Sequence, residues 1–458
     1  MLGAVVNFLV YVYALLHPYA RTLVQPKGFH VAFTAQPGEL VVVWLTYFPQ
    51  WQASFHYKAT QCAASQDWQV LQPTVVWTRR GFVTNGHIVN SAVVSSLHPD
   101  CSYEYTVGYG LIWSQVKSMQ GRSLTADFTL QTSVVVVGDM GSSYHSAATR
   151  SMIDYLRGEM PVHAVLHSGD IAYNLRDPRP SFVRRYFTET ESFAGRIPYM
   201  VAPGNHERQY NFTRYRELFR MPKNSVNEGS NLFYSFDLGL VHFVMYCAEY
   251  LFYDYPESEL THKNWLIADL KAANENRNNV PWVVLIGHRP FYCGINWNLS
   301  LVERFRFQSN FDCSFRASIV RNYMEDLVNT AGVDVVISSH VHNYQRFAPV
   351  YHNSSVPSEV DGLNYHRNPS APVYIVNGAA GNMELNDAIS PTPEPWRQFG
   401  SELLGLGRLQ ACNETHLYWE QWAAETRERL DYVWVEKTRH RYEAIQPLVY
   451  IAEGNRTN

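Results

Sequence analysis

The sequence predicts two domains, a β-sandwich over residues 22–130 and a larger α/β domain over residues 131–400. Three observations support this prediction. The 458 residues exceed the length of one ordinary domain. Short runs rich in Val, Thr and aromatic residues fill the first region, without helical periodicity. Continuous apolar runs alternate with amphipathic helical stretches in the second region, and residues 401–450 are expected to complete that domain.

The first region is predicted to form strands separated by turn signals such as "PG" and "NG". The expected strand segments are 39–48, 53–60, 70–77, 87–97, 102–110 and 125–132. Titratable residues do not cluster in these segments. The region is therefore expected to act as a spacer or docking module rather than as a catalytic unit.

The second region is predicted to contain helices that flank one or two sheets. The expected helical segments are 143–158, 181–193, 265–277 and 318–332. Apolar runs such as "SVVVVGD" and "VPWVVLIGH" show no alternation, which is typical of strands covered on both faces.

The composition and the N-terminal residues indicate which binding partners and which cellular compartment to expect. The formal net charge is −4 with no long basic run, which argues against a nucleic-acid partner. Residues 1–20 are almost purely apolar and resemble the core of a secretory signal peptide, with a short anchor or a wrongly assigned start as alternatives. No later stretch is apolar enough to span a bilayer stably. Secretion or a lysosomal location is expected, and a homodimer is one option for the oligomeric state.

Cysteines and glycosylation sequons agree with the secretory pathway. We expect the disulfides Cys62–Cys101 and Cys293–Cys313, with Cys247 and Cys412 either paired or free. Asn-x-Ser/Thr sequons, which are candidate glycosylation sites, occur at Asn211, Asn298, Asn353, Asn413 and Asn455.

The apolar runs of the second region end in polar side chains. These residues are Asp139, Asp170 with Tyr173 three residues later, Asn205 with His206, His288, and finally His340 with His342. The carboxyl ends of strands in open α/β sheets meet at one crevice, where ligands bind. Each motif alone is compatible with an ordinary turn or a buried structural histidine, but the set predicts a shared site.

The residue types favour two metal ions. Without His206, the set contains two Asp, one Asn, one Tyr and three His. These seven residues exceed the needs of one tetrahedral zinc ion, and they suit two metals that share a bridging carboxylate. The absence of Cys from the set disfavours soft metals. A tyrosine oxygen is a hard donor and favours a ferric ion.

The motifs "GDMG", "GDIAY", "GNHE", "LIGH" and "SHVH" resemble the five-motif signature of the purple acid phosphatases, within the calcineurin-like metallophosphoesterases. The segments "VNGAAGNME" and "THLYWEQ" are similar to segments of the animal members of its high-molecular-weight branch. "LHPDCSY", at residues 97–103, resembles a corner of fibronectin type III-like domains. This resemblance implies a fibronectin type III-like N-terminal domain and a metallophosphoesterase β-sandwich flanked by helices.

The resemblance also implies a role for each motif residue. A ferric ion would be bound by Asp139, Tyr173 and His342. A divalent ion (zinc, iron or manganese) would be bound by Asn205, His288 and His340. Asp170 would bridge the two ions. Together with Tyr173, Gly141 of the first motif separates the chain from nucleotidase-like and phosphodiesterase-like relatives.

Outside the ligands, His206 is expected to bind phosphate with Asn205 and to protonate the leaving alkoxide. Glu207 is a candidate to orient it, whereas His145 and His167 are expected to be structural. Ser339 replaces the glycine that is usual in the family. We expect that serine to be tolerated, so that Ser339→Gly leaves activity nearly unchanged unless the position requires a positive φ.

The expected activity is hydrolysis of phosphate monoesters of small molecules by an acid phosphatase, with a metal-bound hydroxide as nucleophile. One alternative is a secreted phosphodiesterase or pyrophosphatase that uses the same site. The other is a catalytically silent secreted binding protein.

Overall fold

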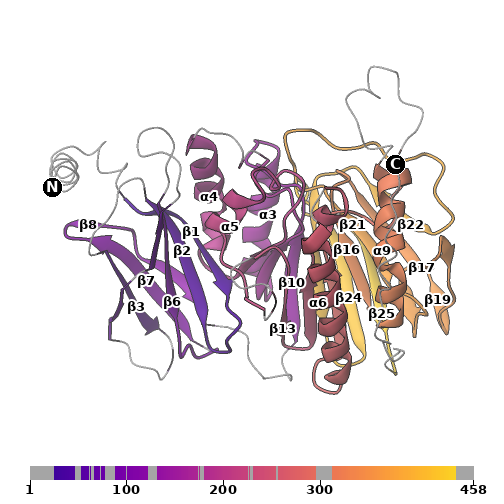
Figure 1. Cartoon of the computed structure of the whole chain (residues 1–458), viewed down its shortest axis with the longest axis horizontal. Helices are drawn as coiled ribbons and strands as arrows, with labels where there is room; N and C mark the ends of the chain where they lie inside the picture. Colours follow the sequence, from indigo (N-terminus) through magenta and orange to yellow (C-terminus); the bar gives the residue numbers. More distant parts are fainter. Residues whose placement is uncertain are drawn as a thin grey trace.

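The computed structural model places two β-rich units side by side (Figure 1). The structure describes residues 25–46, 53–60, 62, 67–72, 74–77, 88–99, 101–121, 131–173, 175, 180–224, 226, 231–253, 256–295 and 312–439. The predicted signal peptide and the sequons at Asn298 and Asn455 lie outside these residues. Asn211, Asn353 and Asn413 are exposed, so they are accessible for the predicted modification.

The N-terminal unit consists of two antiparallel sheets that pack face to face. One sheet has the order β1 (Lys27–Phe33), β2 (Leu40–Thr46), β6 (Ile88–Val94) and β5 (Thr74–Trp77). The other has the order β4 (Gln69–Leu71), β3 (Ser54–Thr60), β7 (Ser102–Tyr109) and β8 (Ile112–Trp113), and β9 (Lys117–Gln120) also pairs with β7.

Aromatic side chains fill the space between these two sheets. Trp44 of β2 stacks on Phe55 of β3 with ring centroids 6.0 Å apart, and Phe55 stacks on Tyr105 of β7 at 5.5 Å. At the predicted corner, the hydroxyl of Tyr103 accepts a hydrogen bond of 2.9 Å from the backbone N–H of His98. The sandwich expected from the strand pattern is therefore present, while its assignment to the fibronectin type III class stays a prediction.

The second unit contains two mixed sheets. Sheet I has the order β12 (Tyr199–Val201), β11 (Ala164–His167), β10 (Thr132–Val137), β23 (Gly405–Ala411), β24 (His416–Ala423), β25 (Arg429–Glu436), β20 (Tyr365–Arg367) and β19 (Val360–Gly362). Strands β10, β11 and β12 run parallel, and β23 pairs with β10 in antiparallel fashion. The C-terminal segment thus supplies strands at the centre of sheet I.

Sheet II lies against sheet I. Its order is β13 (Tyr234–Leu238), β14 (Val241–Met245), β15 (Trp282–Ile286), β16 (Val335–Ser338), β21 (Val373–Asn377), β17 (Tyr344–Tyr351) and β18 (Ser354–Ser355), and β22 (Arg397–Ser401) pairs with β17. Strands β14, β15, β16 and β21 run parallel. Their completely buried Val, Leu and Ile residues explain the continuous apolar runs of the sequence.

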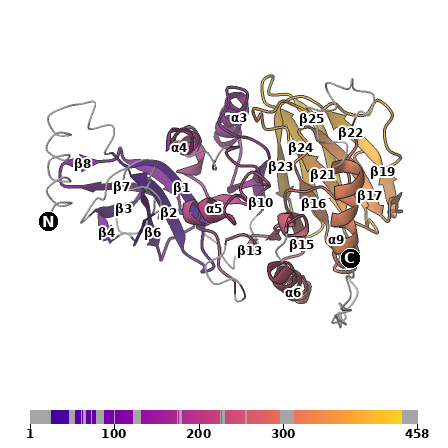
Figure 2. The same ribbon diagram turned by 45° about the horizontal axis from the view of Figure 1, so that its top comes forward.

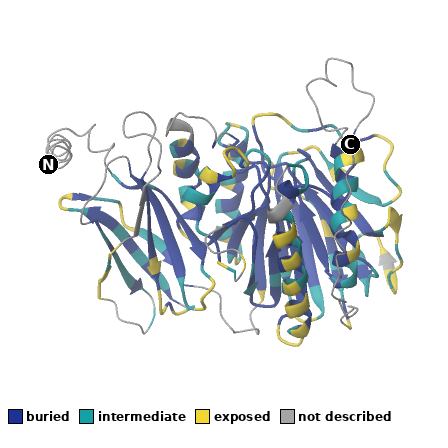
Figure 3. Ribbon diagram, viewed as in Figure 1, coloured by how far each residue is buried: buried dark blue, intermediate teal, exposed yellow. Residues whose placement is uncertain are grey.

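Helices cover the outer faces of the two sheets, which gives a layered arrangement (Figure 2). Helices α3 (Ser146–Glu159) and α4 (Pro180–Ala194) lie beside sheet I, and α6 (Pro256–Glu275) and α9 (Ala317–Thr330) cover sheet II. Shorter elements are α5 (Thr213–Leu218), the 3₁₀ helix η1 (Ala248–Leu251) and the π-helical turn η2 (Asp312–Arg316). Figure 3 shows buried strands between these helices, with exposed residues on the outward side of α6.

The N-terminal unit is attached to the second unit through α4 and the segment before β12. The Glu191 carboxylate of α4 accepts hydrogen bonds from the backbone N–H groups of Gly28 and Phe29, at 2.7 and 3.2 Å, and pairs with Lys117. Val31 of β1 also forms a parallel bridge with Pro198. Strand β1 thereby supports the strand that leads to Asn205.

Two disulfides link the pairs that the sequence suggested, Cys62 with Cys101 and Cys293 with Cys313. Cys247 is buried and free, and Cys412 is half-buried and free. Among the described residues, no helix combines the length and the apolar character that a membrane crossing requires.

Candidate metal centre

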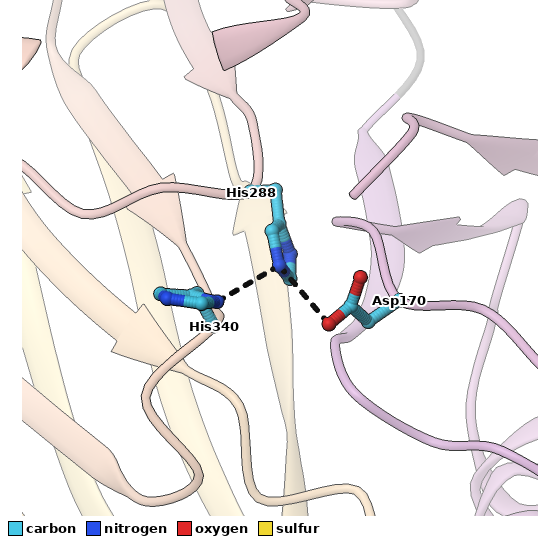
Figure 4. A group of neighbouring side chains, drawn as sticks. All are labelled: Asp170, His288 and His340. Carbon is cyan, nitrogen blue, oxygen red and sulfur yellow. Dashed lines mark hydrogen bonds and ion pairs between the residues drawn. The ribbon is translucent and has the colours of Figure 1, made fainter. Parts of the chain in front are cut away.

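Five strand ends bring the predicted site residues together between the two sheets. Asp139, Asp170 and Asn205 follow β10, β11 and β12 of sheet I, whereas His288 and His340 follow β15 and β16 of sheet II. In Figure 4, His288 lies between His340 and Asp170. The crevice expected at the carboxyl ends of parallel strands is therefore shared by two sheets.

One group of donors consists of Asp139, Tyr173 and His342. The Tyr173 hydroxyl lies 2.8 Å from Asp139 Oδ1 and 2.8 Å from His342 Nε2. His342 Nε2 is 3.5 Å from Asp139 Oδ1. We call this group the tyrosine half-site.

The second group consists of Asp170, Asn205, His288 and His340, and we call it the amide half-site. His288 Nε2 lies 3.2 Å from Asp170 Oδ2, 3.1 Å from Asn205 Oδ1 and 3.2 Å from His340 Nδ1. Ligand atoms of Asp170, His288 and His340 all lie within 4.8 Å of one another. Lone-pair donors of three residue types thus face one small volume.

The local backbone explains how side chains at the ends of strands turn into the site. Asp139, Asp170, Tyr173 and His340 have φ values of 58°, 49°, 56° and 68°. Such left-handed conformations are unfavourable for residues other than glycine, and they occur preferentially at functional sites. All four residues lie in the loops that follow β10, β11 and β16, where the left-handed conformations change the direction of the chain.

Each of the three predicted histidine ligands has its other ring nitrogen held from outside the cluster. His288 Nδ1 is 3.1 Å from the carbonyl oxygen of Ser168, and His342 Nδ1 is 3.0 Å from that of Leu385. His340 Nε2 lies 3.1 Å from the carboxylate of Asp312. Such outer partners fix the ring orientation and the tautomer of metal-binding histidines.

Burial and the histidines shift the pKa values of both aspartates. Burial acts to raise the pKa of Asp139 and of Asp170. The hydrogen bond from His342 lowers the pKa of Asp139, and the charge of His288 lowers that of Asp170, so both lie below the usual aspartate range. Burial lowers the pKa of His288 and His342, but Asp170 and Asp139 raise it to about 9 and about 10.

A buried arginine stands beside His340. Arg289 pairs with Glu249 through Nε at 2.8 Å and with Asp312 through Nη1 at 3.1 Å, and the same Nη1 lies 2.7 Å from His340 Nε2. Burial and the charge of Arg289 lower the pKa of His340. The neutral imidazole that metal binding requires is therefore favoured at His340.

His206 lies next to the cluster and leaves its ring available. Its backbone N–H donates to Asp170 Oδ1 at 2.9 Å, and its ring packs 4.4 Å from that of Tyr173. His206 Nε2 is 3.8 Å from Asp170 Oδ2 and 3.5 Å from Glu384 Oε1. The side chain is 15% exposed, which leaves it reachable from the crevice.

The other predicted residues near the site have structural contacts. Glu207, which we expected to orient His206, instead accepts hydrogen bonds from the backbone N–H groups of Ile171 and Gly204, at 3.0 and 2.9 Å. Burial raises the pKa of Glu207 to about 8, and the Asp170 charge adds to this effect. His167 bonds to Tyr199 at 2.5 Å, and the ring of His145 packs on Tyr144.

Sequence reasoning did not single out several contributors, among them Asp312, Leu385 and Glu384. Asp312 adjoins the disulfide cysteine Cys313. Glu384 ends the "GNME" segment quoted for the family resemblance, and Leu385 directly follows it. The one local feature that could have drawn attention to Asp312 is its position directly before a cysteine. Leu385 contributes only its backbone carbonyl oxygen, and every residue type has such an oxygen, so the sequence could not indicate this contact.

The residues fit a pair of metal ions. Asp139 is completely buried and Asp170 is 1% exposed, and isolated carboxylates are costly in such an environment. The imidazole nitrogens of His288 and His340 face each other at 3.2 Å with Asn205 Oδ1 beside them, an arrangement that suits a shared cation. Hard oxygen and imidazole donors suit iron, zinc and manganese.

Comparisons with known proteins identify the family of this chain. The family model described as calcineurin-like phosphoesterase matches residues 132–344, and the model described as iron/zinc purple acid phosphatase-like protein C matches residues 371–432. Acid phosphatase type 7 of Mus musculus is 31% identical, over 90% of this chain and 91% of its own length. The chain belongs to the purple acid phosphatase family.

Other relatives of this purple acid phosphatase support the assignment. Acid phosphatase type 7 of Homo sapiens is 31% identical, with 90% of each chain covered. The solved structure of a purple acid phosphatase from seeds of yellow lupin (Lupinus luteus) matches with a TM-score of 0.76 at 18% identity, covering 90% of this chain and 74% of that one. The latter match shows the shared metallophosphoesterase fold.

Family membership makes the chain a hydrolase of the acid phosphatase class. It implies hydrolysis of phosphoesters at a dinuclear centre that contains iron and a second divalent metal. Phosphorylated compounds are accordingly the substrates.

Gly169 tests whether the packing around His288 controls the site. A Cβ at Gly169 would lie 2.6 Å from His288 Nδ1, and its φ is 96°. Gly169→Ala should lower the free energy of unfolding by about 1–3 kcal/mol and reduce the bound metal, as measured by denaturant unfolding and elemental analysis. Gly158→Ala is the control: no atom lies within 4 Å of its added Cβ in helix α3, so stability should rise by up to about 1 kcal/mol. Full metal content in Gly169→Ala would contradict the prediction.

Proposed function

We propose that this protein is an acid phosphatase that hydrolyses phosphate monoesters of small molecules. Asp139, Tyr173 and His342 of the tyrosine half-site would hold Fe(III). Asn205, His288 and His340 would hold a divalent zinc, iron or manganese ion, and Asp170 would bridge the two. The observation that supports this most strongly is the Tyr173 hydroxyl, which lies 2.8 Å from both an aspartate and a histidine donor.

When bound, the two metal ions would supply Lewis acidity, neutralising the phosphate oxygens and making hydroxide available from water at acidic pH. The protein residues hold this pair in place. The outer partners Ser168, Asp312 and Leu385 fix the three histidine rings, and the backbone N–H groups of His340 and His206 bind Asp139 Oδ2 and Asp170 Oδ1.

His206 is the group best placed to act on the substrate. It follows Asn205 directly and extends its ring over Tyr173, while its Nε2 approaches Asp170 and Glu384. A protonated imidazole at this position would bind a phosphate oxygen and donate its proton to the leaving alkoxide. Asn205, beside it, would contact the same phosphate.

Secretion or delivery to the lysosome is part of the proposal. The two disulfides are consistent with an oxidising compartment, and three sequons are exposed on the described surface. N-glycosylation at Asn211, Asn353 and Asn413 would follow from this location.

Replacing Tyr173 by Phe tests the ferric assignment. The variant should lose the visible absorption that a tyrosinate bound to iron produces, while circular dichroism shows an unchanged fold. Tyr186→Phe is a matched control, because this tyrosine is also buried and its hydroxyl bonds to Tyr199. Colour that survives in Tyr173→Phe would refute the role of Tyr173.

Replacing His206 by Ala tests the proton donor. Turnover should fall by about 10²–10⁴-fold for esters with poor leaving groups and less for activated aryl esters, since only the former need the proton. Metal content should stay constant, and His145→Ala should behave like the wild type. An equal loss across all leaving groups would argue against general-acid catalysis by His206.

A substrate comparison separates the proposal from its alternatives. The protein loaded with metal should hydrolyse an aryl phosphate monoester at acidic pH much faster than the matching diester or inorganic pyrophosphate. Preference for the diester or pyrophosphate would establish the alternative enzyme on the same residues. Full metal content without turnover of any of these compounds would indicate the catalytically silent binding protein.

A further inference from the structure

Ser339 occupies a central position at the meeting point of the two sheets. It directly follows β16 and is completely buried. The left-handed residue of this turn is His340, with φ of 68°, and Ser339 is not among the residues with positive φ. The turn therefore does not require glycine at position 339 for backbone reasons.

The Ser339 hydroxyl has three hydrogen-bonding contacts, which match the capacity of a serine. It donates to the carbonyl oxygen of Ser168 at 2.5 Å and accepts from the Ser168 hydroxyl at 3.0 Å. The third contact, of 3.2 Å, joins Ser339 Oγ to His288 Nδ1. His288 Nδ1–H thus faces two acceptors, the Ser168 carbonyl and the Ser339 hydroxyl.

Gly138 provides the space for this contact. A Cβ at Gly138 would lie 2.3 Å from Ser339 Cβ and 2.7 Å from the Ser168 hydroxyl oxygen. Gly138 follows β10, Ser168 follows β11 and Ser339 follows β16, so ends of strands from both sheets meet here. This closely packed polar cluster lies on the Nδ1 side of the predicted ligand His288.

We propose that Ser339 is a positioning residue for His288. Its hydroxyl shares the Nδ1–H with the Ser168 carbonyl and so directs Nε2 towards Asp170 and Asn205, where the divalent metal would bind. This inference rests on the proposed function. It revises the expectation from sequence that Ser339→Gly is nearly neutral, because the hydroxyl contacts a ligand that glycine could not reach.

The contacts also predict which properties stay unchanged. Without the Ser339 hydroxyl, the Ser168 hydroxyl keeps the Val137 carbonyl as acceptor at 3.2 Å, and the Ser168 carbonyl keeps His288 as donor. No buried polar group of this cluster is left without a partner, so the fold should tolerate the change. None of the three hydroxyl contacts of Ser339 described above involves the tyrosine half-site.

Ser338 supplies a matched control. It precedes Ser339, is 3% exposed, and donates one hydrogen bond of 3.2 Å to the carbonyl oxygen of Ile375 on β21. Ser338→Ala removes a buried serine hydroxyl from the end of β16, next to Ser339, and its hydrogen bond is not to a predicted ligand. A general weakening of this region would affect both serine variants alike.

The experiment compares the wild type, Ser339→Ala, Ser339→Gly and Ser338→Ala, each loaded with both metals. Each protein is dialysed against increasing EDTA, and the retained iron and second metal are measured by elemental analysis. The EDTA concentration that removes half of the second metal should fall about tenfold in both Ser339 variants. Iron content, visible absorption and the Tm of the metal-free protein should match those of Ser338→Ala.

Two results would overturn the inference: wild-type retention of the second metal in Ser339→Ala, or an equal loss in Ser338→Ala. A wild-type protein that binds fewer than two metals would instead overturn the proposed function. Because the wild type is measured separately from the variants, the two failures are distinguishable.

Discussion

Two carboxylates buried side by side are the constraint on which the rest of the site depends. Asp139 is completely buried and Asp170 is 1% exposed, and burial of unpaired negative charges would cost several kcal/mol each. The structure offsets this cost with backbone N–H groups of His340 and His206 and with the imidazoles of His342 and His288. Every one of these groups comes from a loop at the end of another strand, so the carboxylates determine how those loops must turn.

The two sheets meet this requirement through strands that are far apart in sequence. Strand β10, which precedes Asp139, pairs with β11 on one side and with the C-terminal β23 on the other. Strand β12, which leads to Asn205, follows Pro198, where β1 of the N-terminal sandwich forms its bridge. The N-terminal unit and the C-terminal strands therefore both support strands that present ligands. Neither the N-terminal unit nor the C-terminal strands β23–β25 contain a predicted metal ligand.

Much of the fold and most of the site could be predicted from the sequence, because both leave local patterns. Unbroken apolar runs mark strands buried on both faces, and the polar residue that ends each run marks the edge of a sheet. Outer partners such as Asp312 and the Leu385 carbonyl could not be predicted. Asp312 is 28 residues from His340 in the chain, and Leu385 is 43 residues from His342. Their contacts depend on how loops pack rather than on a repeating pattern.

The sequence by itself determined the identity and order of the predicted donor residues and the strands that precede them, because each of these is encoded in residue type and local spacing. It suggested the two cysteine pairs, but only the tertiary structure established which cysteines are linked. The family resemblance implied the division of the donors into two groups, but only the tertiary structure decided which ring nitrogen of each histidine faces inward. It also decided that Ser339 contacts His288. These features depend on the packing of sheet I against sheet II, which brings residues as far apart as Ser168 and Ser339 within 2.5 Å. A distance of that kind is set by side-chain packing and backbone turns in three dimensions, and no periodicity along the chain records it.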